Sequence, residues 1–169
     1  MPNWCDNYLS LTGPRDKINE IVEAATSVNP DAAGMFQHVL PLDENTGVLG
    51  AAEAWGTKWD INDADILDFD EDVSYEDLVK VEMSFMTAWA PPAGVYEQLD
   101  NEGFYVYAAY YEPGVCVCGV FDEGEIREYD FENLDPESFR DNEDLERLDD
   151  MFGITESELF DDEEEEDLI

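Results

Sequence analysis

The sequence is poor in basic residues, since seven Lys and Arg stand against 45 Asp and Glu and the formal net charge is -38. Soluble domains usually carry a net charge of a few units, because self-repulsion destabilises a compact chain. Naked nucleic acid and anionic membranes both attract Lys and Arg, so this composition disfavours both as direct partners. The charge predicts a partner that is itself basic.

Cysteine and histidine are also scarce, with three Cys and one His in 169 residues. So few cysteines, in an odd number, argue against a disulfide framework and for a reducing cytosol. Cys116 and Cys118 are spaced to share one face of a strand. Adding Cys5 and His38 would complete a zinc ligand set, but one intervening residue is not the usual spacing of a zinc knuckle. We therefore expect buried, apolar cysteines, a structural histidine and no metal.

Catalytic and membrane motifs are missing as well. Any Ser–His chemistry would have to use His38, and the sequence has neither a Gly-x-Ser-x-Gly elbow nor a phosphate-binding glycine loop. Aspartates 68, 70 and 72 imitate a calcium loop, but Val73 replaces its turn glycine and Val79 its bidentate glutamate. No run approaches about 18 apolar residues, and the N-terminus does not resemble a signal peptide. We expect a cytoplasmic protein without catalytic residues or cofactors.

Apolar residues are plentiful enough for a core, because 44% of the sequence is hydrophobic and 12% is aromatic. Near-alternation over residues 4–12 predicts a strand that ends at Gly13 and Pro14. Apolar residues at three-to-four spacing from Ile18 to Ala25 predict a helix directly after it. Residues 36–42 are expected to be a short extended segment, and the acidic residues 60–77 remain ambiguous.

Further strands are indicated by alternating or aromatic-rich runs that end at Gly or Pro turns. They cover residues 80–89, 104–111, 115–121 and 125–131. A short helix with Val95, Tyr96 and Leu99 lies between the first two. This order predicts an α+β fold, a ferredoxin-like split βαβ sandwich with an added C-terminal β-hairpin and an acidic helical tail. The expected divisions are a domain at 1–131, an acidic helical extension at 132–160 and an acidic, disordered tail at 161–169.

The tryptophans, at positions 4, 55, 59 and 89, could suggest a stacking platform for bases or sugars. The acidic charge would repel phosphates before any base could stack, so core packing is the expected role of these rings. Lys58 stands between Trp55 and Trp59 and is the residue best placed for any unfamiliar enzyme chemistry. The alternative for Lys58 is an internal ion pair with Asp60.

Four motifs in order carry a family resemblance. They are Met1 to Cys5 with Asn7, Trp55 to Asp60, Phe85 with Thr87 to Pro92, and Tyr110 to Gly114. Together they resemble a phage- and plasmid-borne family with a YubB-type, or Api-like, ferredoxin-like domain, and the match runs from Met1 to about Phe131. The resemblance implies a ferredoxin-like fold and a mobile-element gene in bacteria, but no established activity. The acidic excess and the residues beyond Phe131 depart from it.

A small acidic domain in that setting predicts a DNA mimic, whose carboxylates replace phosphates in the DNA site of a basic host protein or defence complex, such as a restriction enzyme, CRISPR complex or polymerase. The candidate partner-binding acids are Asp60, Asp63, Asp65, Asp68, Asp70, Glu71, Asp72, Glu123, Glu125, Glu128, Asp130, Glu132, Asp161, Asp162, Glu163 and Glu164.

Three alternatives to mimicry stay open. The first is adaptation to high salt, which predicts an even acidic coat, whereas 23 of the 45 acids lie after Phe121. The second is an accessory phage or plasmid protein with a solubilising tail. The third is an enzyme of unfamiliar chemistry around the tryptophans and Lys58.

Overall fold

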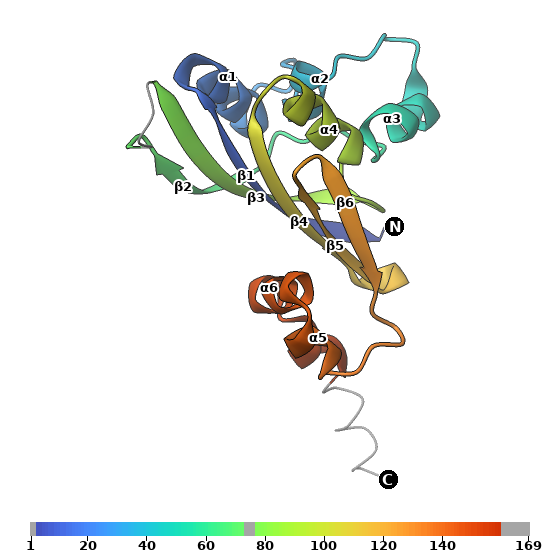
Figure 1. Cartoon of the computed structure of the whole chain (residues 1–169). Coiled ribbons are helices and arrows are strands. Elements are labelled where there is room, and N and C mark those ends of the chain that lie inside the picture. Colours follow the sequence, from blue (N-terminus) through green and yellow to red (C-terminus); the bar gives the residue numbers. More distant parts are fainter. Residues whose placement is uncertain (1–2, 73–76, 160–169) are drawn as a thin grey trace.

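The computed structural model describes residues 3–72 and 77–159. Its centre is a six-stranded antiparallel sheet in the order β2-β3-β1-β4-β5-β6 (Figure 1). The strands are β1 (Trp4–Pro14), β2 (Asp65–Asp70), β3 (Leu78–Ala88), β4 (Tyr105–Glu112), β5 (Val117–Asp122) and β6 (Glu125–Asp130). Mixed helices and an antiparallel sheet confirm the expected α+β class.

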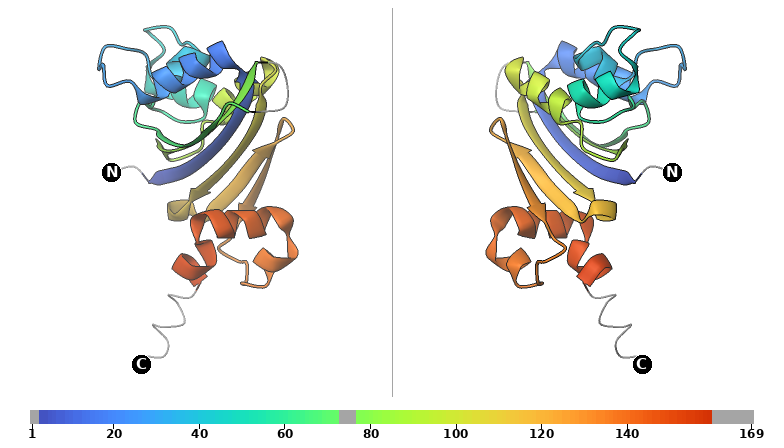
Figure 2. Two further views of the ribbon diagram at one scale, coloured as in Figure 1. Left: turned by 90° about the vertical axis from the view of Figure 1, so that its left-hand side faces the viewer. Right: turned by 90° about the vertical axis from the view of Figure 1, so that its right-hand side faces the viewer.

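The helices form two groups on opposite faces of this sheet, as Figure 2 shows. The first group is α1 (Arg15–Thr26), α2 (Met35–Val39), α3 (Gly47–Trp55) and α4 (Ala93–Asn101). The second group is α5 (Ser138–Asp141), α6 (Glu143–Phe152) and the short turn η2 (Thr155–Leu159), while η1 (Pro113–Val115) joins β4 to β5. Both faces of the sheet are therefore covered in part.

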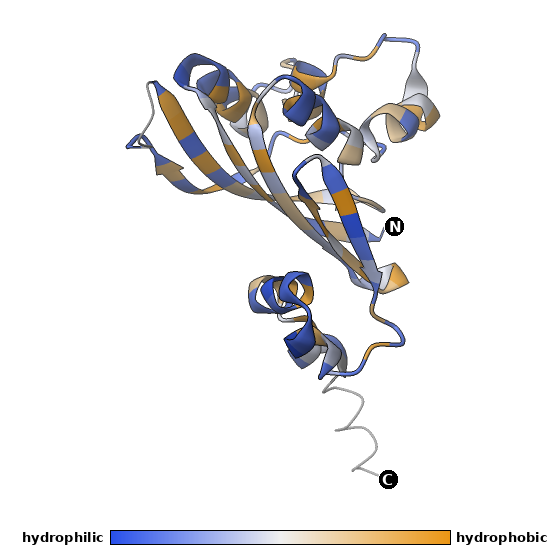
Figure 3. Cartoon of the chain, viewed as in Figure 1, coloured by the Kyte–Doolittle hydropathy of each residue, from blue (hydrophilic) through white to orange (hydrophobic). Residues whose placement is uncertain are grey.

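Burial alternates along β1, so successive side chains of this strand point to opposite faces of the sheet. Leu9 and Leu11 are buried beneath the first helical group, while Tyr8 lies on the opposite face. Figure 3 shows the corresponding hydrophobic and hydrophilic bands along the strands. The expected strands around 4–12, 80–89, 104–111, 115–121 and 125–131 are confirmed to within a few residues.

Residues 36–42 do not form the extended segment that we expected. Met35–Val39 is the helix α2, because the carboxylate of Asp60 accepts hydrogen bonds from the backbone N–H of Phe36 at 2.7 Å and of Gln37 at 3.2 Å. Capping the first N–H groups of a helix in this way stabilises a length that is marginal alone. The capping residue lies 24 positions away in the chain, so local periodicity does not reveal it.

The C-terminal helices close a second hydrophobic cluster against β4 and β5. Phe139, Leu145, Leu148 and Ile154 are buried there, together with Phe131 at the end of β6. The apolar residues of α5 and α6 serve this cluster. Removing the chain after Asn133 would uncover an apolar sheet face as well as remove acids.

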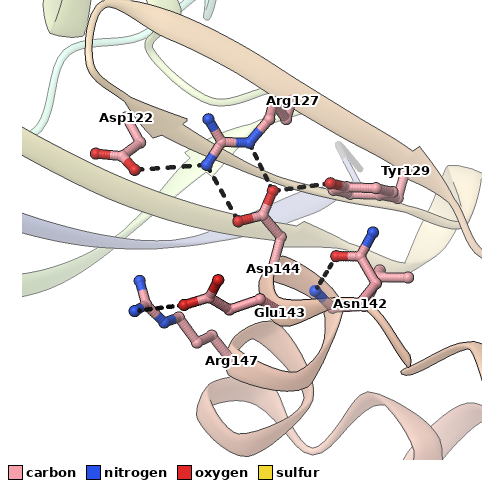
Figure 4. A network of polar contacts seen from close by, with 8 residues as sticks. Asp122, Arg127, Tyr129, Asn142, Glu143, Asp144 and Arg147 are labelled. Carbon is pink, nitrogen blue, oxygen red and sulfur yellow. Dashed lines mark hydrogen bonds and ion pairs between the residues drawn. The ribbon is translucent and has the colours of Figure 1, made fainter. Parts of the chain in front are cut away.

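A polar clasp joins α6 to the edge of the sheet (Figure 4). Arg127 on β6 holds the carboxylate of Asp144 through two N–H groups, at 2.6 and 3.1 Å, and also donates to Asp122 at 3.4 Å. The hydroxyl of Tyr129 donates to Asp144 at 2.8 Å. These hydrogen bonds, mainly that from Arg127, hold the pKa of Asp144 below its ordinary value.

The clasp should make stability depend on pH in a defined direction. Because the pKa of Asp144 is lowered by folding, its contribution is present above the unfolded pKa and is lost as the pH falls through the folded pKa. We expect Asp144→Asn to lower the free energy of unfolding by about 1–2 kcal/mol at pH 7, a value reduced for the partial exposure of Arg127. Urea denaturation of both proteins from pH 7 to pH 3 should show this gap closing at the acid end.

The control for this experiment is Asp150→Asn, which removes an exposed carboxylate from the same helix. It should shift the urea midpoint little at any pH. A gap between wild type and Asp144→Asn that stays constant down to pH 3 would contradict a stabilising ionised Asp144.

Candidate functional site

The candidate acids lie mainly along the two opposite edges of the sheet. The register places Asp65, Asp68 and Asp70 of β2 on one face, because a bulge between Ile66 and Asp68 restores the alternation. Glu71 and Asp72 continue this exposed line, which we call the β2 edge (Asp65, Asp68, Asp70, Glu71 and Asp72). Edge strands carry unpaired backbone groups, and charges there discourage pairing with other chains.

The second line of acids is the β6 edge (Glu123, Glu125, Glu128, Asp130 and Glu132), and all five residues are exposed. Glu128 is tied to the sheet because its carboxylate accepts the hydroxyl of Tyr110. Five strand spacings of about 4.8 Å separate the two edges, roughly 24 Å across the sheet. The acids that we grouped from the sequence thus form two separate lines.

The remaining candidate acids have other positions. Asp60 is half-buried and caps α2, so its carboxylate serves the fold. Asp63 is exposed in the segment that leads into β2. The tail acids Asp161, Asp162, Glu163 and Glu164, with the expected disordered tail at 161–169, lie outside the described residues.

The expected core packing of the tryptophans is wrong for three of the four. Trp4, Trp59 and Trp89 are 44%, 44% and 48% exposed, whereas Trp55 is 6% exposed and donates its indole N–H to the carbonyl of Leu40 at 2.9 Å. The rings of Trp4 and Trp59 lie 6.3 Å apart. We call Trp4, Trp59 and Trp89 the tryptophan patch. Trp4 begins β1, Trp89 directly follows β3, and Trp59 lies in the turn after α3.

Lys58 belongs to this patch. Its ammonium group lies 4.4 Å from the ring centre of Trp59 and 5.6 Å from that of Trp89. Aromatic faces attract a cation in this geometry. The ion pair with Asp60 that we considered for Lys58 is not formed among the described residues, because Asp60 is engaged with α2.

A buried network of hydrogen bonds around Asn7 and Thr87 lies next to the tryptophan patch. The amide of Asn7 donates to Thr87 Oγ1 at 2.8 Å and to the carbonyl of Cys5 at 3.1 Å, and it accepts the hydroxyl of Tyr96 at 3.2 Å. Thr87 Oγ1 in turn donates to the carbonyl of Ala90 at 2.7 Å. The network therefore fixes β1, β3 and α4 together with the turn that carries Trp89.

Trp89 itself has an unusual backbone, with a φ of 73° that side chains other than glycine rarely adopt. Its N–H donates to the carbonyl of Asn3 at 2.8 Å, and Thr57 Oγ1 donates to the carbonyl of Ala88 at 2.8 Å. Residues from three of the sequence motifs thus converge on this turn. Backbone strain of this kind persists where many surrounding contacts fix the conformation, and it is frequent at functional sites.

Next to the patch the structure has an acidic hollow of about 480 Å³. It lies on the sheet face that the C-terminal helices leave partly open. Its lining residues are Trp4, Asp6, Asn7, Asp63, Asp65, Ser84, Phe85, Met86 and Phe152. Asp6, Asp63 and Asp65 are its three carboxylates, and no basic residue lines it in the part of the chain that the structure describes. Burial raises the pKa of Asp6 above its ordinary value.

Asp6 was not among the acids predicted from the sequence, although its position in the alternating strand indicates which face it occupies. It lies two positions from Tyr8 on β1, so both share the face opposite Leu9 and Leu11. The hollow also requires Phe152, which arrives from the far end of α6. Only the packing of α6 on this face brings the two together.

The cysteines and the histidine differ in exposure, since Cys5 and Cys118 are buried, Cys116 is half-buried and His38 is exposed. Burial raises the pKa of the Cys5 and Cys118 thiols to about 12, which leaves both unreactive near neutral pH. Cys116 precedes β5 with a φ of 57°, so the two thiols do not share a strand as we expected. His38 is exposed on α2, with its Nε2 atom 3.8 Å from Glu20. Among residues 3–72 and 77–159, no group of three or more potential ligands is arranged to hold a metal ion.

None of the helices in the described ranges combines the length and the apolar character that crossing a membrane requires. Comparison of the chain with protein-family models, with curated proteins and with solved structures finds no match.

Proposed function

We propose that the chain is a phage-type binding protein that inhibits a basic host DNA-binding protein or defence complex by DNA mimicry. The observation that carries the proposal is the placement of exposed carboxylates along both open edges of one sheet. Same-face residues of a strand recur about every 6.6 Å, roughly twice the 3.4 Å of helix axis that each phosphate of one DNA strand occupies. Each edge thus presents its own line of regularly spaced negative charge to a DNA-binding surface.

The placement of the basic residues also supports this proposal. Arg15 pairs with Glu71 at 2.7 Å, Arg127 with Asp144 at 2.6 Å, and Arg147 with Glu143 at 3.2 Å. Three of the seven positive charges are therefore offset locally by acids. The field that an approaching partner meets is dominated by carboxylates.

The fold and setting in this proposal are a ferredoxin-like split βαβ sandwich in the cytoplasm of a host cell. The order β2-β3-β1-β4, with α1 and α4 on one face, supports that fold, and β5 and β6 would be its added hairpin. The four motifs that resemble the phage and plasmid family support the setting. The proposed role is binding without catalysis.

The test is capture of host proteins at low salt, followed by elution with short duplex DNA. We expect DNA to release a nuclease, polymerase or defence complex, because both ligands would occupy the same basic site. Changing Asp68→Asn, Asp70→Asn and Glu125→Gln together should weaken binding of that protein at least about tenfold, since charge complementarity is lost at both edges.

The matched control changes Glu23→Gln, Glu53→Gln and Glu97→Gln, three exposed acids of the helical layer. It removes the same total charge and should change the affinity less than about twofold if position matters. A captured protein that DNA does not release would overturn the mimicry. Equal weakening by both triple variants would show a general charge effect.

Salt adaptation remains a second candidate, because exposed acids also cover the helical layer. Those on α1 are Asp16, Glu20 and Glu23, and Glu53 and Glu97 lie on α3 and α4. A salt-adapted protein needs molar salt to screen its self-repulsion, whereas a mimic acting in an ordinary host must fold near 0.1 M. Circular dichroism across a potassium chloride series separates the two.

A further inference from the structure

We infer that the acidic hollow beside Trp4 is a docking site for an arginine side chain from a basic partner protein. The inference rests on the basic partner of the proposed function, but not on DNA mimicry. It concerns a site apart from most of the two edge lines, since only Asp65 belongs to both the hollow and the β2 edge.

The hollow is lined by both apolar and anionic side chains. Trp4 and Met86 are 44% and 49% exposed in it, so large apolar side chains face solvent at one place. Asp6, Asp63 and Asp65 share this lining, and no basic residue belongs to it in the part of the chain that the structure describes. Guanidinium is the cation that suits both features, because it stacks flat on aromatic rings and donates two parallel hydrogen bonds to a carboxylate.

The patch already binds one cation of its own. Lys58 lies over Trp59 and Trp89, so two rings of the patch already hold a positive charge near their faces. Trp4 borders the hollow and keeps nearly half of its surface exposed. Tryptophan and arginine are also the residues most enriched at the energetic centres of protein interfaces.

Charge decides what occupies the hollow. A second copy of this chain, or its own acidic C-terminal sequence, would bring carboxylates toward carboxylates. A cationic side chain instead relieves the unfavourable charge of Asp6, whose partial burial raises its pKa. The occupant is therefore an arginine of another protein.

The experiment titrates the isotope-labelled full chain with a nine-residue peptide that carries three arginines among Gly and Ser, and with its lysine counterpart. We expect the arginine peptide to shift the Trp4 indole N–H signal in the NMR spectrum, and to bind at least about fivefold more tightly than the lysine peptide near 0.15 M salt. Changing Asp6→Asn, Asp63→Asn and Asp65→Asn together should weaken the arginine peptide at least about tenfold.

Two controls make the outcome decisive. The charge-matched variant with Glu23→Gln, Glu53→Gln and Glu97→Gln should weaken the arginine peptide less than about twofold. Trp4→Leu should abolish the preference for arginine over lysine while leaving the urea midpoint within the range of the other variants. Equal binding of both peptides, equal weakening by both triple variants, or an unmoved Trp4 signal would each overturn the site.

This proposal and the proposed function fail separately. The peptide titration needs no host protein, and the edge variant of the previous section retains all three carboxylates of the hollow. Loss of peptide binding in the hollow variant alone would support the docking site even if DNA never released a captured partner. Chain dimerisation through the hollow, measured by sedimentation, would contradict the cationic occupant.

Discussion

Asn7→Leu is expected to lower the free energy of unfolding by about 3 kcal/mol. Asn7 is 2% exposed, and its amide satisfies Thr87, Tyr96 and the carbonyl of Cys5. Leucine fills a similar volume but leaves the buried hydroxyl of Tyr96 without its acceptor and Thr87 Oγ1 without its donor, and an unsatisfied buried group costs about 1–3 kcal/mol. Urea denaturation followed by circular dichroism measures the loss.

The same substitution should also disturb the tryptophan patch, because Thr87 links Asn7 to the carbonyl of Ala90 beside Trp89. Tryptophan fluorescence of the folded variant should differ from that of the wild type. Asn19→Leu, at an exposed position of α1, is the control and should cost less than about 0.5 kcal/mol. A loss below about 1 kcal/mol for Asn7→Leu would show that water or rearrangement satisfies the network.

Leu148→Ala should lower the free energy of unfolding by about 3 kcal/mol. Leu148 is fully buried on α6, in the cluster that also contains Phe139 and Ile154. The truncation removes apolar contacts and leaves a cavity, and both effects destabilise the native state. Amide hydrogen exchange should locate the loss, with α6 opening more readily than β1.

The control for Leu148 is Met151→Ala, which truncates an exposed side chain of the same helix. It should cost less than about 1 kcal/mol. If Leu148→Ala cost no more than this, the C-terminal helices would be a loosely held appendage. If the expected loss is found, deletion beyond Asn133 cannot isolate the role of the acids there, and charge-changing point substitutions become the appropriate test.

Much of the secondary structure followed from local pattern. The alternation in β1 and the three-to-four spacing in α1 are periodicities of the backbone itself, so a short window of sequence reveals them. The helix α2 shows the limit of this reasoning, since its N-terminal cap comes from Asp60 across a long loop. A helix whose stability depends on a distant side chain has no local signature.

Some features of the candidate site likewise follow from the sequence, whereas others depend on the packing of the chain. The composition shows by itself that this protein is strongly acidic and has enough apolar residues to form a core. The packed structure was needed to show that most of the described candidate acids lie at two opposite edges, that Trp4, Trp59 and Trp89 are exposed, and that Trp4 and Phe152 line one hollow. The physical reason is that charge and periodicity are properties of the chain, whereas the exposure of a ring or carboxylate depends on which strand pairs beside it and which helix packs above it.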